Sequence, residues 1–283
     1  MTIGLRSTAV PKDVIEKLRL IGLEAADILG KGESGISMLS DYLQWATRAV
    51  RVIGFDLSTD EINRLIATPR HSALQSVNPT SYSGSLGELV SLEVNDRIRE
   101  LDEARDELSN DYEEWGRGAA MAVVLDTNVM ISFYDKLTRI NWNAKLNARR
   151  HIPFILAVPM KVVDELDNLK DRGVGDVRTK ARQAVLMLEE TFAYGIRREM
   201  LADAGPAITT NRSSIHIKLI KDELVHVPRA IPDAEIIDRA LSIAPYVQNT
   251  YVATNDTGMI LRARTFGLNA FRITGSDLME EEA

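Results

Sequence analysis

The chain has 283 residues, of which 45% are hydrophobic, and a formal net charge of −7. This length allows two domains with buried cores. The sequence contains neither an apolar run long enough to span a bilayer nor a signal-peptide pattern, so we expect a cytoplasmic protein with no membrane partner. With no cysteine, disulfides and thiolate zinc sites are excluded.

Charge divides the chain into two parts. Residues 1–119 hold 13 basic and 20 acidic residues and so account for the whole −7. Residues 120–276 carry +4, and residues 277–283 form an acidic tail. A net basic region is a reasonable partner for nucleic acid, whereas the acidic N-terminal part argues against an RNA guide there.

Helical periodicity dominates the first 117 residues. Apolar spacing predicts helices at residues 11–29 and 34–53, and the capping-box pattern from Ser58 to Glu61 opens a third. A Ser- and Gly-containing loop is expected at residues 71–87, followed by a long charged helix at residues 88–115. Because Gly116 and Gly118 form a natural boundary, we predict an all-α N-terminal domain at residues 1–117.

The long helix of this domain has an apolar stripe at helical spacing, formed by Val90, Val94, Ile98 and Leu101. Such a stripe is typical of a helix that packs against another helix. Structural packing or dimerisation is the simplest role, so we expect the domain to support a homo-oligomer or to bind a regulatory protein.

An apolar run at residues 121–125 predicts a buried strand that ends in Asp126, Thr127 and Asn128. In open α/β sheets ligands bind outside the carboxyl ends of the strands, which makes Asp126 a candidate metal ligand. The same residues also suit a turn or a helix cap, so this motif alone leaves both interpretations open.

A second strand is predicted at residues 154–159, followed by a helix at residues 161–170. Glu165 lies beside the apolar stripe of that helix, where it can point along the sheet edge. Asp167 precedes Lys170 by three residues, a spacing that favours a surface ion pair.

The remaining elements repeat this design. Ile215, Ile217 and Leu219 alternate with polar residues, which predicts an extra edge strand or hairpin within residues 204–227. A helix at residues 232–241 opens with Pro232 and Asp233, an acid that also suits a plain first-turn position. A strand at residues 251–256 then ends in Thr254, Asn255 and Asp256, before a helix at residues 257–264.

In their order and spacing, these motifs resemble those of the PIN domain nucleases. The resemblance covers residues 121–274 and rests on Asp126-Thr-Asn, Glu165-Leu-Asp167, Asp233 in an Asp-x-x-Ile-x-x-x-Ala setting, and Thr254-Asn-Asp256. The long spacing between the second and third motifs is similar to that of the larger PIN domains of RNA-processing and PhoH-like proteins. The resemblance implies a Rossmann-like α/β domain at residues 120–276, with a central parallel sheet flanked by helices.

The resemblance also implies an acidic quartet that is both catalytic and metal-binding: Asp126, Glu165, Asp233 and Asp256. Asp167 and Asp238 are secondary candidates, and Thr127, Asn128, Thr254 and Asn255 are expected to orient carboxylates or touch substrate. Carboxylate oxygens suit Mg²⁺ or Mn²⁺. The implied activity is that of a metal-dependent endoribonuclease, RNA-processing or toxin-like, which hydrolyses RNA with metal-activated water and leaves a 5′-phosphate and a 3′-hydroxyl.

Basic residues cluster in two places in this half of the chain. Lys170, Arg178 and Arg182 are expected to bind substrate phosphates, with Arg182 as the first choice, and residues 145–150 contain a smaller basic group. A solvated charged surface is an equally plain interpretation of both.

Other chemistries fit less well. Asn128 stands where an aspartyl phosphatase would need a second carboxylate, and no Gly-rich nucleotide loop is present. The four histidines, at positions 71, 151, 216 and 226, lack zinc-like spacing and are expected to be surface or core residues. Two alternatives stay open: a non-catalytic PIN module that binds RNA or protein, and a structure-selective DNA nuclease.

Overall fold

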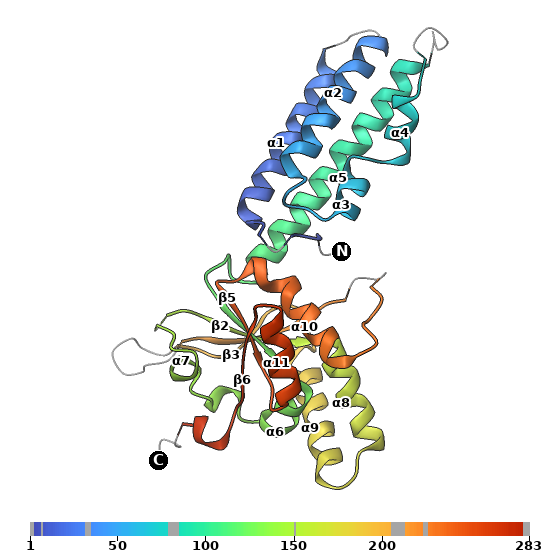
Figure 1. The fold of residues 1–283 in the computed structure, drawn as a ribbon. Coiled ribbons are helices and arrows are strands. Elements are labelled where there is room, and N and C mark those ends of the chain that lie inside the picture. The colour runs from blue at the N-terminus through green and yellow to red at the C-terminus, as the bar shows by residue number, and fades with distance from the viewer. Residues whose placement is uncertain are drawn as a thin grey trace. The chain divides into compact units, whose positions relative to one another are not determined.

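A computed structural model describes residues 3–6, 8–31, 35–78, 85–149, 151–204, 213–222 and 226–279. The chain forms two compact units, Met1–Glu113 and Glu114–Ala283, drawn as ribbons in Figure 1. Predictions that concern Ser34, Arg150 and residues 79–84, 205–212, 223–225 and 280–283 lie outside the described residues. None of the described helices combines the length and apolarity needed to cross a bilayer.

The N-terminal unit is built from helices, as its periodicity predicted. They are α1 (Pro11–Gly30), α2 (Gly35–Ile53), α3 (Thr59–Leu65), α4 (Pro69–Gln75) and α5 (Leu86–Glu114). Tyr42 and Trp45 of α2 are fully buried, and the Trp45 indole donates a hydrogen bond to the carbonyl of Ile21 in α1 at 3.0 Å. These contacts place α2 in the core of the unit.

Helix α4 lies where the sequence predicted a loop, so that prediction was wrong for residues 71–75. Thr68 and Pro69 start this helix, since the Thr68 hydroxyl accepts a hydrogen bond from His71 N at 3.0 Å and Pro69 occupies the first helical position. With seven residues, α4 is too short to show a helical repeat of apolar side chains.

The predicted capping box of α3 is only half formed. Ser58 Oγ accepts a hydrogen bond from Glu61 N at 3.3 Å, as expected of an N-cap. The Glu61 carboxylate does not return to Ser58; it accepts instead from Gly4 N at 3.4 Å and pairs with Arg64. The side chain thus ties the start of the chain to α3.

A buried carboxylate, Glu93 of α5, joins three other elements of this unit. Its side chain is 1% exposed and contacts four polar side chains at 3.0–3.2 Å: Tyr42, Thr68, Arg70 and Arg97. Arg97 also donates to the carbonyls of Arg64 and Leu65 at 2.7 and 2.9 Å. Because Glu93 and Arg97 are both buried, the pair links α5 to α2, α3 and α4 through partners that water cannot replace.

His71 and Tyr42 extend this network. The Nδ1 atom of His71 lies 3.2 Å from the Tyr42 hydroxyl, which donates to Glu93. Burial lowers the pKa of His71, while burial and the Glu93 carboxylate raise the pKa of Tyr42. Both shifts favour the neutral forms of these side chains.

The second unit contains a six-stranded sheet with the order β3-β4-β2-β1-β5-β6. Its strands are β1 (Met121–Leu125), β2 (Phe154–Pro159), β3 (Glu199–Ala202), β4 (Ile215–Ile220), β5 (Asn249–Ala253) and β6 (Asn269–Phe271). Every neighbouring pair is parallel except β3–β4. The predicted Rossmann-like fold is confirmed: β1 and β2 are buried throughout, and the carboxyl ends of the parallel strands share one edge.

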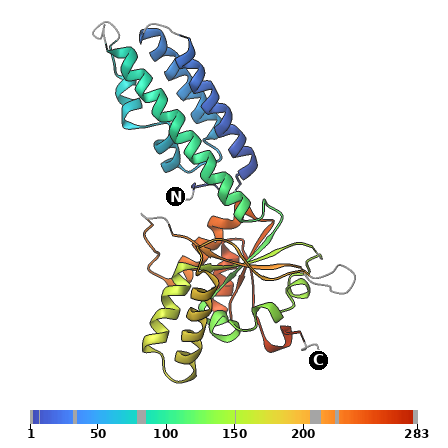
Figure 2. The ribbon, with the colours of Figure 1, turned by 180° about the vertical axis from the view of Figure 1, so that it is seen from behind.

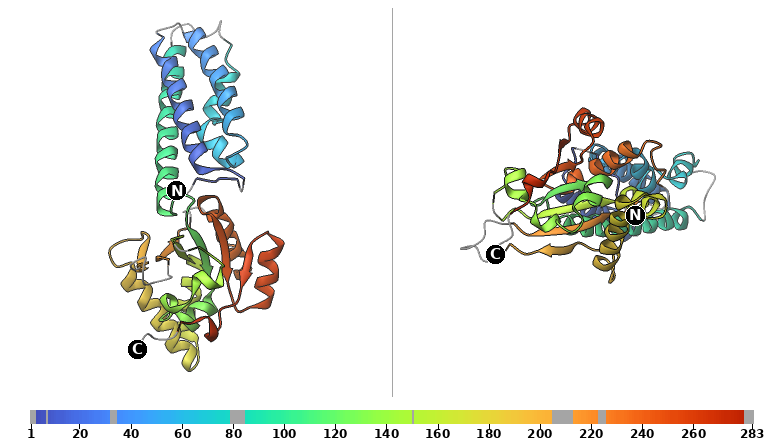
Figure 3. Two further views of the ribbon diagram at one scale, coloured as in Figure 1. Left: turned by 90° about the vertical axis from the view of Figure 1, so that its left-hand side faces the viewer. Right: turned by 90° about the horizontal axis from the view of Figure 1, so that it is seen from below.

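Helices pack around this sheet. They are α6 (Thr127–Phe133), α7 (Trp142–Lys145), α8 (Met160–Arg172), α9 (Asp176–Thr191), α10 (Pro232–Ile243) and α11 (Thr257–Thr265), with short 3₁₀ turns η2 (Leu137–Arg139), η3 (Ala244–Tyr246) and η4 (Gly275–Asp277). Helices α8 and α9 lie side by side as a pair (Figure 2 and Figure 3), and α6 and α10 both contact α8.

The strand predicted within residues 204–227 is confirmed as β4, but its predicted edge position was wrong: it lies inside the sheet between β2 and β3, and β3 forms the edge. Lys218, one of the polar residues that suggested an edge, has partners that bury it. Lys218 is 4% exposed because its ammonium pairs with Glu114 and lies 5.2 Å from the centre of the Trp115 ring. In the sequence, this buried and paired lysine could not be distinguished from a lysine that faces solvent on an edge strand.

The end of the described chain is anchored to the second unit. Asp277, assigned to the acidic tail in the sequence analysis, pairs with Lys145 at 2.8 Å and accepts from Thr274 N at 2.7 Å. Lys145 is thereby engaged by a carboxylate. The predicted domain boundaries, at residues 1–117, 120–276 and 277–283, stay predictions.

Candidate metal centre

Asp126 lies where β1 ends and α6 begins, and its side chain is held from three directions. Its Oδ1 accepts from Thr127 N at 2.7 Å, and its Oδ2 accepts from Asn128 Nδ2 and from Thr254 Oγ1, both at 2.6 Å. Asp126 is only 7% exposed. All three donors are neutral, so they fix the orientation of the carboxylate without cancelling its charge.

The end of β5 is tied to the end of β1 through the fully buried Thr254. The hydroxyl of Thr254 donates to Asp126 and accepts from Asp256 N at 3.1 Å. A second link joins the same two connections, because Asn255 N donates to Asn128 Oδ1 at 3.1 Å. The two polar triplets predicted from the sequence therefore form one hydrogen-bonded unit at the sheet edge.

Both strand-end aspartates also cap helices, as the plainer interpretation of the motifs expected. Asp126 is the N-cap of α6, and Asp256 caps α11 by accepting from Met259 N at 3.0 Å. Capping uses Oδ1 of each carboxylate. The two roles are compatible, because a carboxylate has about four acceptor positions.

Two helices bring further acids to this edge. Thr127 Oγ1 donates to Glu165 Oε2 of α8 at 2.5 Å, which joins the second acidic motif to the first. Asp233 lies half-buried in the first turn of α10. Burial raises the pKa of Asp126; hydrogen bonds from Thr254 and Thr127 oppose this, and the charges of Glu165 and Asp233 raise it further. The carboxylates of Glu165 and Asp233 thus each repel that of Asp126 electrostatically.

Ion pairing separates the predicted quartet from the secondary candidates. Asp167 pairs with Lys170 at 2.6 Å, as its spacing predicted. Asp238 is 2.9 Å from Arg229 and 2.6 Å from Arg239; burial works to raise its pKa, but these hydrogen bonds lower it. Among the described residues, by contrast, no basic side chain forms an ion pair with any of the quartet: Asp126, Glu165, Asp233 and Asp256.

A second acidic group lies nearby and was missed in the sequence. Asp222, just after β4, lies with His226 and Glu235 so that one ligand atom from each falls within 4.8 Å of the others. It is the one such set in the described part of the chain, so the quartet is not gathered as tightly. Zinc-like spacing was sought for histidines alone, whereas His226 meets an acid nine residues later, at 2.7 Å from Glu235.

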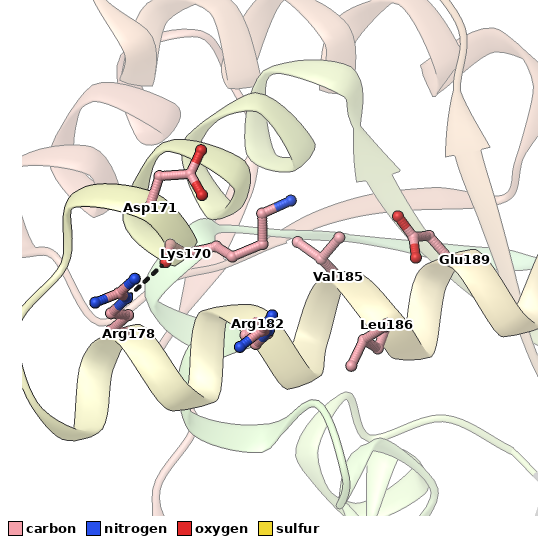
Figure 4. Close-up of a pocket in the computed structure, with 7 residues that line it drawn as sticks. All are labelled: Lys170, Asp171, Arg178, Arg182, Val185, Leu186 and Glu189. Carbon is pink, nitrogen blue, oxygen red and sulfur yellow. Dashed lines mark hydrogen bonds between the residues drawn. The ribbon is translucent and has the colours of Figure 1, made fainter.

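The predicted phosphate-binding residues line a cavity of about 220 Å³ between α8 and α9, shown in Figure 4. Lys170 is engaged by Asp167, and Arg178 Nε donates to the carbonyl of Lys170 at 3.0 Å. Arg182 is exposed and forms no hydrogen bond or ion pair with any residue that the structure describes. Asp171 and Glu189 also line the cavity, so its charge is mixed and Arg182 is the basic group most available to a phosphate.

Comparison with protein families gives one match. The family model of the PIN domain matches residues 123–274, which include all four strand-end and helix acids described above. No curated protein matches the sequence.

Proposed function

The chain belongs to the PIN domain family, whose members are generally nucleases, and we propose that it is a metal-dependent endoribonuclease. One observation carries the proposal: Asp126 is buried and oriented by neutral donors, next to Glu165 and Asp233, with no basic partner among the described residues. Such an arrangement destabilises the empty site and favours a bound cation.

The donor set suits a hard divalent cation. Asp126, Glu165, Asp233 and Asp256 offer carboxylate oxygens, the ligands that Mg²⁺ and Mn²⁺ prefer, and no cysteine is present to favour a softer metal. These four residues would hold the ion. When bound, it would supply a nucleophilic water at neutral pH and offset the negative charge of the phosphodiester.

The surrounding side chains have two tasks in this proposal. Thr127 and Thr254 hold Asp126 and Glu165 in fixed rotamers, which reduces the reorganisation needed when the site fills. Asn128 joins the β1 and β5 ends by bonding to Asp126 and to Asn255 N. Along α9, Arg182 would bind a phosphate of the substrate away from the cut.

The substrate assignment follows from the family resemblance and is tested by a matched set of labelled nucleic acids with Mn²⁺. The set comprises a single-stranded RNA, its duplex and a branched DNA of equal length. We expect cutting of single-stranded RNA, with new ends that are ligated without prior kinase treatment because they carry 5′-phosphates. Cutting of branched DNA alone would make the protein a structure-selective DNA nuclease, and RNA binding without cutting would favour the non-catalytic module.

A further inference from the structure

The missed acidic group beside the candidate metal centre already contains a cation. Arg239 of α10 directs its guanidinium into the group formed by Asp222, His226 and Glu235. Its Nε is 3.3 Å from Glu235 Oε1, its Nη1 is 4.0 Å from Asp222 Oδ1, and its Nη2 is 3.4 Å from His226 Nδ1. The guanidinium therefore already brings a positive charge to all three residues, as expected of a charge network.

Glu235 is the centre of this network. It is 2% exposed, and its Oε2 accepts from Arg229 N at 2.6 Å while its Oε1 lies 2.7 Å from His226 Nε2. A carboxylate that is buried to this degree needs a compensating charge, which Arg239 supplies. Through these contacts Glu235 holds residues 226–229, the segment that leads into α10.

The contacts of Glu235 with residues 226–229 take the place of an ordinary helix cap for α10. The N-cap of α10 is Ile231, which forms no side-chain cap hydrogen bond, and Pro232 follows at the first helical position. Helices usually begin at a residue whose side chain accepts from the free backbone N–H groups. In α10 the entering chain is held by Glu235 from within the helix, so the position of the first turn depends on the Glu235–Arg239 pair.

Asp233 lies in that first turn, two residues before Glu235. Its side chain forms no hydrogen bond or ion pair with any described residue, so its place at the metal centre is set by the backbone that carries it. We propose that Arg239 is a positioning residue for Asp233: it keeps Glu235 in place, and Glu235 fixes the turn that presents Asp233. This inference rests on the proposed function, in which Asp233 is a metal ligand.

The geometry of the guanidinium matters as much as its charge. Arg239 also donates to Asp238 at 2.6 Å, so its planar fork serves two acids of α10, Glu235 and Asp238, at once. A lysine keeps the charge at a single point and cannot reproduce these contacts. Arg239→Lys thus removes the fork while retaining a cation for the buried Glu235, which favours a folded variant.

The test is a calorimetric titration with Mn²⁺ of the full chain and three variants: Arg239→Lys, Asp233→Asn and the double variant. We expect Arg239→Lys to weaken Mn²⁺ binding by about tenfold, the lower end of the loss seen when groups behind a metal ligand are removed. In the Asp233→Asn background the same substitution should cause no further loss, because its effect passes through Asp233. Arg229→Lys is the matched control, since its side chain is 62% exposed and, among the described residues, pairs with Asp238 alone.

The outcomes distinguish an error about the role of Arg239 from an error about the metal centre itself. If Arg239→Lys binds Mn²⁺ like the unchanged protein, or weakens it equally with and without Asp233, the positioning role is wrong and Arg239 acts on general stability alone. If the unchanged protein itself binds no Mn²⁺, the proposed metal centre is wrong, whatever the role of Arg239.

Discussion

Asp126→Asn is expected to reduce RNA cleavage by about a hundredfold to a thousandfold or more, the loss that follows removal of a single group acting on transition-state charge. The Asp126 side chain is held by three hydrogen bonds at 2.6–2.7 Å, more than any other acid of the quartet accepts from the described residues. The charges of Glu165 and Asp233 also raise its pKa. An amide keeps the shape but weakens the ligand. Initial rates of cutting of a labelled single-stranded RNA with Mn²⁺ measure the loss.

The same variant should remain folded, which makes the loss of activity interpretable. Because burial raises the pKa of Asp126, the folded state favours the neutral carboxyl, and the ionised form at neutral pH costs stability. A neutral isostere removes that cost. We therefore expect Mn²⁺ to raise the melting temperature of the unchanged protein but not of Asp126→Asn.

Asp176→Asn serves as the control for this experiment. Asp176 is an aspartate at the start of a helix in the same unit, but its side chain is 75% exposed and pairs with Lys180 at the surface. Cleavage should continue at the unchanged rate. Equal rates for Asp126→Asn and Asp176→Asn would remove Asp126 from the metal centre.

Glu93→Ala is expected to destabilise the N-terminal unit by about 3–5 kcal/mol, because it leaves the buried Arg97 without its anion. It also removes the acceptor for the hydroxyls of Tyr42 and Thr68. Native-state hydrogen exchange in increasing urea measures the stability of this unit separately, through the protection of the amides of α2, α4 and α5. Their protection should fall together, since Glu93 joins these helices.

Glu103→Ala provides the comparison on the same helix. Glu103 is 61% exposed and only 3.9 Å from Arg99, so its removal should cost less than about 1 kcal/mol. If the two variants lost the same protection, the Glu93 network would not hold the unit together, and packing of the apolar stripe alone would account for its stability.

Two residues of the candidate metal centre could be predicted from the sequence because they follow the ends of strands. Asp126 comes directly after the apolar run of β1, and Asp256 closes the polar triplet that follows β5. Parallel strands that share a sheet must present such residues at one edge. The links between them lie outside the reach of sequence patterns. The hydrogen bond from Thr254 to Asp126 joins positions 128 residues apart, and helical spacing places Glu165 on a face without showing its contact with Thr127.

The sequence does not show which partner a polar side chain has, and this led to the wrong prediction for β4. Lys218 made β4 resemble an edge strand, although Glu114 and Trp115, more than 100 residues earlier, bury it. His226 was expected to be a surface or core residue, and sequence spacing did not show that its partner is the acid Glu235. Helix α4 differs, because Thr68 and Pro69 did signal its start, and only its length hid it.

The four carboxylates at the sheet edge, which form no ion pair with any described residue, are proposed to bind a divalent cation that the cleavage reaction requires. This proposal is tested most directly by treating the full chain with a chelator, measuring cutting of a labelled single-stranded RNA, and then restoring Mn²⁺ or Mg²⁺ in excess. We predict no cutting with the chelator and recovery with either ion, in the unchanged protein but not in Asp126→Asn. Cutting that persists in the chelator would mean that the reaction needs no divalent cation, and RNA that is bound yet never cut with either ion would mean that the protein is not a nuclease.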